Sequence, residues 1–276
     1  FTKSKFDDQE LKWESPWGVG YPGWHIECSC ISMKHLGEYL DIHCGGIDNA
    51  FPHHTNEIAQ SEAYLGHDWC NYWFHVHHLN TNDGKMSKSK GEFLTVSLLE
   101  EKGYDPLVYR FFCLQSHYRK SLVFSWDNLD NAAAAYEKLT AKTAAILDGS
   151  GGTDEEKRAA LKKNFTDAMD SDLNTALAVT ALYDVLKADI SNKDKLDLIS
   201  DFDRVLSLGL MEAAKKHAAK NAADDDIPEE VKALAEQRKA ARKEKNFALA
   251  DEIRDKIAAL GYAITETREG TKITKA

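Results

Sequence analysis

The sequence predicts an α/β fold for the first part of the chain, followed by a helical bundle and a small mixed module. Short apolar runs alternate with helical patterns up to about Pro106, which is typical of a parallel sheet with crossover helices. After Pro106 the pattern is helical almost throughout, and the chain ends with a helical pair and two short strand-like runs. We therefore expect domains at 1–105, 106–212 and 231–276, with a linker at 213–230.

The composition is that of a globular protein from a reducing compartment. The chain has 276 residues, and 43% of them are hydrophobic. Its net charge of −10 argues against a protein that coats nucleic acid non-specifically, but such a net charge is compatible with local basic faces. The five cysteines are an odd number outside any small loop-rich framework, so metal-binding or free thiols are expected. No apolar run reaches the roughly 18 residues of a membrane span. We expect a cytoplasmic monomer.

Breakers and apolar spacing predict the elements of the first part. "WHIECSCISMKHLG" predicts a helix that ends at Gly37, and "YLDIHCGG" predicts a short strand that two glycines stop. The next helix is predicted between Pro52 and Gly66, because proline is favoured at the start of a helix and glycine just after its end. "NYWFHVHHLN" predicts an aromatic strand, followed by a tight turn at 82–84.

The later segments are predicted from periodicity and composition. "NLDNAAAAYEKLTAKTAAIL", "EEKRAALKKNFTDAMD" and "LNTALAVTALYDVLKADI" have the spacing of bundle helices. The segment 213–230 is small, charged and free of aromatic residues, so its composition predicts a flexible linker.

A cysteine, a histidine and a glutamate are candidate zinc ligands. His53 and Glu57 are four residues apart on a predicted helix and therefore share one face, and Cys28 lies upstream of them. A thiolate, an imidazole and a carboxylate suit zinc, and three protein ligands with an open position are typical of a catalytic site. The spacing alone also fits a buried cysteine with nearby surface groups. Cys30 and Cys44 are competing thiols.

A cationic loop is a candidate phosphate site. "GKMSKSKGEF" places Lys85, Lys88 and Lys90 beside two serines and between glycines. Such a loop can close over a triphosphate and stabilise charge as pyrophosphate leaves. The alternative is a solvated basic loop, which a lone pair of lysines would favour and the full string does not.

The motifs resemble the cysteinyl-tRNA synthetases, a family of class I aminoacyl-tRNA synthetases. "KMSKS" matches the signature of the class, and "GWHIEC", "DIHCGGIDNAFPHHTNEIAQSEA" and "NYWFHVHH" look like this family in particular. Farther on, "VYRFFCLQSHYRKSLVFSWDNLDNA", "DSDLNTALAVTALYDVL" and "RKEKNFALADEIRDKIAALGYAITETREGT" resemble its connecting region, helical bundle and anticodon-recognition module. The resemblance implies the second half of a Rossmann-like catalytic domain, followed by these parts.

The resemblance also implies roles for individual residues. The zinc ligands would be Cys28, His53 and Glu57; Trp24, His43 and Asp48 would lie at the amino-acid pocket; and Lys88, helped by Lys85 and Ser87, would bind ATP. Taken alone, Trp24 also fits a core residue, His43 a satisfied buried histidine and Asp48 a helix cap.

The implied reaction has two steps. The carboxylate of cysteine attacks the α-phosphorus of ATP, supplied with Mg²⁺, and the terminal ribose hydroxyl of tRNA(Cys) then attacks the adenylate. An open position on the single zinc ion would accept the thiolate of cysteine and discriminate against serine. An apolar pocket separates near-isosteres by only about 1–3 kcal/mol. A bond between the metal and the thiolate would discriminate far more, so no separate editing domain is expected.

The sequence departs from the family in one major respect. The other signature of the class, His-Ile-Gly-His, is absent, as is the upstream cysteine that would be the fourth zinc ligand. Lys90 and Glu92 stand where the family often has Leu and Asn. We therefore expect that this sequence is a fragment and that it is inactive alone.

The C-terminal segment is locally basic. Residues 231–276 contain 11 Lys/Arg and 7 Asp/Glu, a balance of +4. We expect tRNA contacts from a basic run, with Phe247 and Tyr262 as nearby stacking groups. The run consists of Arg238, Lys239, Arg242, Lys243 and Lys245. The alternative is a solvated amphipathic helix.

Two other functions compete with the leading interpretation. A ligase that joins cysteine to a sugar amine in thiol biosynthesis shares the zinc and lysine-rich regions, but it does not need the basic C-terminal segment. A non-catalytic tRNA-binding fragment is the second alternative, because the first half of the catalytic fold is missing.

Overall fold

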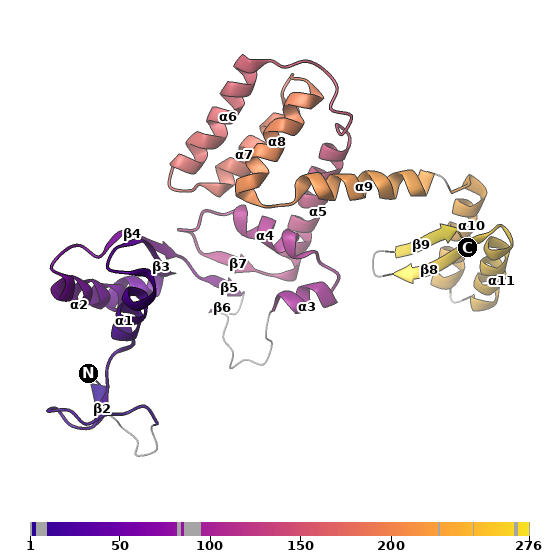
Figure 1. The fold of residues 1–276 in the computed structure, drawn as a ribbon. Coiled ribbons are helices and arrows are strands. Elements are labelled where there is room, and N and C mark those ends of the chain that lie inside the picture. Colours follow the sequence, from indigo (N-terminus) through magenta and orange to yellow (C-terminus); the bar gives the residue numbers. More distant parts are fainter. Residues whose placement is uncertain are drawn as a thin grey trace. The chain divides into compact units, whose positions relative to one another are not determined.

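The protein is described by a computed structural model that covers residues 2–3, 10–81, 84–85, 95–225, 227–244, 246–267 and 270–275. The chain forms two compact units. Unit 1 consists of Phe1–Ser89 and Ser116–Ser125, and unit 2 consists of Lys90–Gln115 and Trp126–Ala276. Figure 1 follows the order of their elements along the chain.

Unit 1 has the strand–helix–strand order that the sequence predicts. Its helices are α1 (Trp24–Leu36) and α2 (Thr55–Leu65), the second preceded by a 3₁₀ turn (Ile47–Asn49) and a π-helical turn (Ala50–His54). Its strands are β1 (Thr2–Lys3), β2 (Gly20–Tyr21), β3 (Leu40–Gly46), β4 (Cys70–Val76), β5 (Leu79–Thr81), β6 (Gly84–Lys85) and β7 (Leu122–Phe124). The expected helix ends are confirmed, because Gly37 and Gly66 cap α1 and α2 with positive φ angles of 92° and 77°.

The centre of unit 1 is a parallel pair of strands. β3 pairs with β4 from Leu40↔Cys70 to Gly46↔Val76, and α2 is the crossover between them. β5 pairs in parallel with β7 and antiparallel with β6. Both sets of strands agree with the predicted α/β class, although the sequence analysis did not anticipate β7. The carboxyl ends of β3 and β4 lie together and lead into the turns that carry the candidate site.

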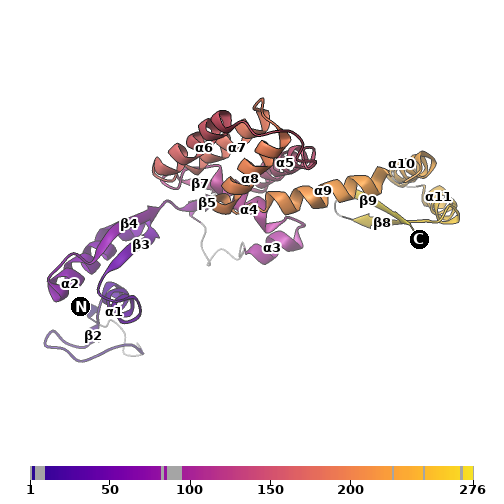
Figure 2. The same ribbon diagram turned by 45° about the horizontal axis from the view of Figure 1, so that its top comes forward.

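Unit 2 is helical apart from one hairpin in its described part (Figure 2). Its helices are α3 (Val96–Glu101), α4 (Pro106–Leu114), α5 (Trp126–Ala144), α6 (Glu155–Asp170), α7 (Thr175–Lys187), α8 (Asn192–Leu206), α9 (Leu210–Asp225), α10 (Glu229–Lys243) and α11 (Phe247–Ala259). Side-chain caps begin several of them: Asp105, Asp154 and Ser191 accept hydrogen bonds from the first turns of α4, α6 and α8. Buried Phe111, Leu139, Leu182, Ile199 and Phe202 contribute to the bundle core.

The segment expected to be a flexible linker is mostly helical. α9 continues to Asp225 and α10 begins at Glu229. Alanine and lysine are strong helix formers, and Leu210 and Ala214 are fully buried where α9 packs along α5. The expectation of a flexible segment at 213–230 is therefore wrong for residues 213–225, and the domain boundaries stay a prediction.

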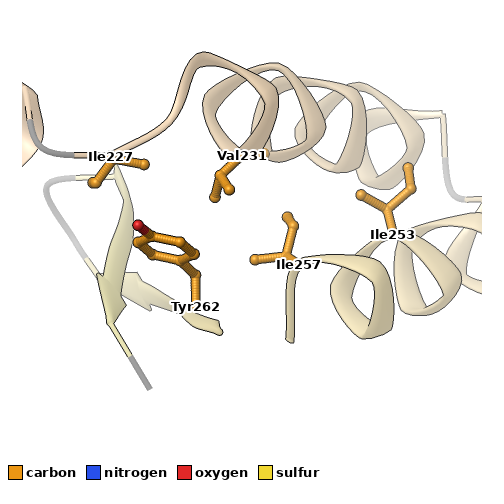
Figure 3. Packing of buried hydrophobic residues seen from close by; sticks show 6 residues of the cluster. Ile227, Val231, Ile253, Ile257 and Tyr262 are labelled. Atoms are coloured by element: carbon orange, nitrogen blue, oxygen red, sulfur yellow. The ribbon is translucent and has the colours of Figure 1, made fainter. Parts of the chain in front are cut away.

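The C-terminal module has an apolar core of its own (Figure 3). Ile227, Val231, Ile253, Ile257 and Tyr262 meet between α10, α11 and the hairpin of β8 (Tyr262–Thr267) and β9 (Gly270–Lys275). The predicted helical pair and two strand-like runs are confirmed. Among the described residues, no helix has the length and apolar character that a membrane crossing requires.

Candidate metal centre and nucleic-acid surface

The three candidate zinc ligands converge in unit 1. Cys28 lies on the second turn of α1, His53 in the π-helical turn and Glu57 on the first turn of α2. Their ligand atoms all lie within 4.8 Å of one another. Zinc binds such atoms at about 2.0–2.3 Å in tetrahedral geometry, so a cluster of this size is compatible with one ion. The helical spacing that suggested His53 and Glu57 is therefore realised in space.

The charge pattern of this cluster favours a cation. Glu57 is fully buried, and its Oε1 atom lies 2.9 Å from His53 Nε2. Burial raises the pKa of the Cys28 thiol, and the nearby Glu57 and Glu27 carboxylates raise it further. A buried carboxylate beside a thiol is costly unless a positive charge joins them. The donor set therefore fits zinc, which needs the thiolate, the carboxylate and an imidazole nitrogen.

His43 holds the other oxygen of Glu57. Its Nε2 atom lies 2.8 Å from Glu57 Oε2, and its side chain is 18% exposed. Carboxylate ligands of metals are usually fixed by a second hydrogen bond of this kind. The structure thus places His43 against a candidate ligand, and His43, His54 and Glu57 form a second group that overlaps the first.

Sequence reasoning missed a layer of histidine and tryptophan rings beside the cluster. The His54 ring stacks on His43 with centroids 4.7 Å apart, and His54 Nδ1 lies 2.8 Å from His75 Nε2. Trp69 and Trp73 pack against His43. The available signal was strand alternation, because His43 pairs with Trp73 and Gly45 with His75 across the parallel strands, which puts these side chains on one face.

One ring of this layer, that of His54, is held in its neutral form. Burial lowers the pKa of His54 to about 4, and His43, His75 and His53 contribute to the same direction. His54 is therefore uncharged at neutral pH. Gly45 is required here, since a Cβ atom at this position would lie 2.7 Å from the His54 ring.

The other predicted pocket residues lie near the carboxyl ends of the strands or on α1. Asp48 follows β3 in the 3₁₀ turn, and its Oδ1 atom lies 3.5 Å from His78 Nε2. A Cβ atom at Gly46 would lie 2.5 Å from Asp48 Oδ1, so a larger residue there would require the Asp48 carboxylate to shift. Trp24 begins α1 with 71% of its surface exposed, which rules out the core alternative within the described part of unit 1.

The candidate phosphate-binding loop falls mostly outside the described residues. Ser87 and Lys88 lie there, and so do the lysine and glutamate at positions 90 and 92. The backbone of Lys85 pairs with Asn80 in the β5–β6 ladder. The roles expected for this loop stay predictions.

The basic run of α10 does not form one exposed face. Arg238 is 9% exposed and lies on the buried stripe with Val231, Ala235 and Ala241. The neighbouring Lys239, Arg242 and Lys243 are exposed, and Lys245 lies outside the described residues. Tyr262 belongs to the apolar core, whereas Phe247 is 60% exposed. The expectations that Arg238 lies on the surface and that Tyr262 is a stacking group are therefore corrected.

Three family models match successive parts of the chain. Residues 2–134 match the tRNA synthetases class I (C) catalytic domain, and residues 164–224 match the DALR domain. Residues 224–272 match the cysteinyl-tRNA ligase anticodon binding domain. The chain belongs to the cysteinyl-tRNA synthetase family.

Named members of this family are similar over almost the whole chain. A cysteine–tRNA ligase of Treponema denticola is 43% identical over 96% of this chain, and that of Borreliella burgdorferi is 41% identical over 100% of this chain. The ligase of Caldicellulosiruptor saccharolyticus is 44% identical over 96% of this chain. The matches cover 58%, 60% and 59% of these relatives, so the chain spans less than two thirds of their length.

A solved structure supports the fold. The chain resembles a leucyl-tRNA synthetase of Agrobacterium radiobacter K84, solved in a ternary complex with tRNA and LeuAMS. The TM-score is 0.51 at 15% identity, over 76% of this chain and 34% of the solved one. At this identity the likeness shows the class I fold alone, and it agrees with the predicted architecture.

Proposed function

We propose that the chain takes part in charging tRNA(Cys) with cysteine, through activation of cysteine by ATP and transfer to the tRNA. The observation that carries this proposal is the convergence of Cys28, His53 and Glu57 beside the carboxyl ends of two parallel strands, in a chain of the cysteinyl-tRNA synthetase family. Ligands of α/β folds bind at this edge of the sheet.

Cys28, His53 and Glu57 would hold one zinc ion. When bound, zinc supplies an open Lewis-acid position that prefers a thiolate to a hydroxyl and so distinguishes cysteine from serine. His43 orients the Glu57 carboxylate through the 2.8 Å contact, and the rings of His54 and Trp73 pack against His43.

Other residues of the chain would bind and orient the substrates. Asp48 carries a half-exposed carboxylate at the carboxyl end of β3, a suitable partner for the substrate ammonium. Trp24 would cover the amino-acid pocket. Lys88, with Lys85 and Ser87, would bind the phosphates of the Mg²⁺–ATP complex. Positioning and charge stabilisation are sufficient for this chemistry, which needs no covalent nucleophile on the enzyme.

The C-terminal module favours tRNA over a sugar amine as the second substrate. It matches a domain described as anticodon binding, and it exposes Lys239, Arg242 and Lys243 as well as the ring of Phe247. A cysteine:sugar-amine ligase has no use for such a surface. The alternative is a chain that binds tRNA but takes no part in the activation of cysteine. Pyrophosphate exchange distinguishes the two functions.

Cysteine-dependent ATP–pyrophosphate exchange tests the proposal. Two proteins should be compared: this chain, and a chimera that joins it to the part of the Treponema denticola relative outside the match. We expect exchange from the chimera with cysteine and much less with serine, and charging of a tRNA(Cys) transcript. A folded, zinc-loaded chimera that binds tRNA(Cys) without exchanging pyrophosphate would support the non-catalytic alternative.

A further inference from the structure

A network of hydrogen bonds fixes the turn between α8 and α9. The Asp203 carboxylate accepts two backbone hydrogen bonds, from Leu208 N at 2.6 Å and from Leu210 N at 2.8 Å. Its carbonyl accepts a third, from Ser207 N at 2.7 Å. One residue near the end of α8 therefore holds three backbone amides between Ser207 and Leu210, the first residue of α9.

Two further side chains hold the carbonyls of the same turn. Arg110 Nε on α4 donates to Leu206 O at 2.6 Å, and the Tyr136 hydroxyl on α5 donates to Leu208 O at 2.6 Å. Burial raises the pKa of Tyr136 to about 12, and Asp105 and Asp203 raise it too, so this hydroxyl keeps its proton. The turn is thus bonded to α4, α5 and α8 at once.

The backbone of the turn has an unusual shape that these bonds maintain. Ser207 and Gly209 have φ angles of +52° and +64°, a region that a non-glycine residue adopts only at some cost. Leu208 and Leu210 are fully buried on either side of Gly209. A Cβ atom at Gly209 would lie 3.1 Å from Leu107 Cδ1, so the turn is also closely packed on α4.

This turn sets the direction of α9. The first two turns of α9 pack along α5, where Ala214 is fully buried, whereas positions 219–222 are exposed. α9 ends at Asp225, and Ile227 already belongs to the core of the C-terminal module. A change at the turn therefore alters the path along which the chain reaches that module.

We propose that Asp203 is a positioning residue for tRNA binding, which acts by fixing the turn at 206–210 and hence the direction of α9. The inference rests on the proposed function, because it requires that one tRNA contacts the C-terminal module and a second part of the chain. Two linked contacts reinforce each other only if the linker holds them at the right spacing. The bonded turn contributes to that condition by fixing the direction in which α9 leaves the bundle.

Two RNAs separate a spacing effect from a local one. The first is a full-length tRNA(Cys) transcript, and the second is its anticodon stem–loop, which is long enough only for the C-terminal module. The variant is Asp203→Asn in the complete 276-residue chain. The matched control is Asp201→Asn, on the same helix, whose carboxylate makes surface ion pairs with Lys162 at 2.7 Å and Arg204 at 3.6 Å.

We expect Asp203→Asn to weaken binding of full-length tRNA on the order of tenfold and to leave stem–loop binding unchanged. Asp201→Asn should change neither. Hydrogen exchange should quicken in the first variant at the amide of Leu208 or of Leu210, because asparagine keeps only one of the two acceptor oxygens. Tyr136→Phe removes the hydrogen bond to Leu208 O. It should also weaken binding of full-length tRNA but not of the stem–loop, with a smaller effect, and it replaces Asp203→Asn in the test if that variant does not fold.

Each other outcome has a definite meaning. Faster exchange at the turn with unchanged tRNA binding would overturn the positioning role while leaving the proposed function intact. Equal weakening of both RNAs would also overturn it, since the effect would then lie in the module itself. If the wild-type chain binds neither RNA, the proposed function fails for this chain, and the positioning role fails with it.

Discussion

The candidate metal cluster of unit 1 and the C-terminal module of unit 2 are stabilised by opposite means. The cluster buries polar and ionisable groups, with Glu57 at 0% and His54 at 3% exposure, and two buried serines, Ser29 and Ser61, hydrogen-bond to each other between α1 and α2. The module buries isoleucine, valine and tyrosine around α10 and α11. The free energy of burying an ionisable group depends on whether it has a hydrogen-bond or charge partner, whereas burying an apolar group is favourable without a specific partner. The comparison predicts that the two regions respond differently to metal, to core substitutions and to salt.

Removal of metal should give the largest difference between the two regions. Zinc binding contributes directly to the stability of the residues that it joins, so a chelator should loosen α1 and α2. We expect no such dependence for the module. Hydrogen–deuterium exchange with and without chelator measures both regions in one sample. Equal loss of protection in both, or in neither, would contradict the comparison.

Ile257→Ala should give the reverse pattern. Ile257 is fully buried in the apolar core of the module, so its truncation should cost about 2–5 kcal/mol of module stability. Zinc content should stay unchanged. Leu260→Ala is the matched control, because Leu260 is 42% exposed just after the same helix. Exchange protection of α10 and α11 and elemental analysis provide the two readouts.

His43→Ala should weaken zinc binding without abolishing it. His43 touches the carboxylate of Glu57 rather than completing the cluster of Cys28, His53 and Glu57, and removal of such a partner typically costs about 10–100-fold in metal affinity. Competition with a chromogenic chelator measures the affinity. A complete loss of zinc would indicate that His43, His54 and Glu57 are the true ligand set.

The exposed basic residues of α10 should give the smallest effect. Replacing Lys239, Arg242 and Lys243 together with glutamine should make the salt dependence of tRNA binding shallower, by a slope of about 0.7–0.9 for each phosphate that these side chains neutralise. Arg238→Gln should instead lower the stability of the module, because Arg238 is buried. An unchanged salt slope in the triple variant would mean that this face of α10 does not bind tRNA.

The sequence predicted the parts of the fold and the site that depend on local spacing. The pairing of His53 with Glu57 follows from the i, i+4 rule, and the helix ends follow from Gly37 and Gly66. The prediction for Arg238 was wrong because the charged residues were treated as one run, without regard to the helical period. With that period, Arg238 lies on the same face of α10 as the buried apolar residues. The helix at 213–225 was missed because its lack of aromatic residues outweighed its strong helix formers.

Long-range contacts account for what could not be predicted. The His43–Glu57 and His54–His75 contacts join residues 14 and 21 positions apart in the chain, because they link β3 to α2 and the π-helical turn to β4. The bonds of Arg110 and Tyr136 to the α8–α9 turn span 96 and 72 positions. Local sequence patterns carry no information on such pairs.

Zinc content is the most direct test of the metal centre on which the proposed function depends. Protein purified without chelator should contain about one zinc per chain, because the two overlapping groups of candidate ligands share Glu57. Cys28→Ala should lose most of this zinc, whereas Cys30→Ala, which removes an exposed thiol from the same helix, should keep it. Equal zinc in the two variants, or none in the wild-type chain and in the chimera, would contradict the assignment of Cys28, His53 and Glu57.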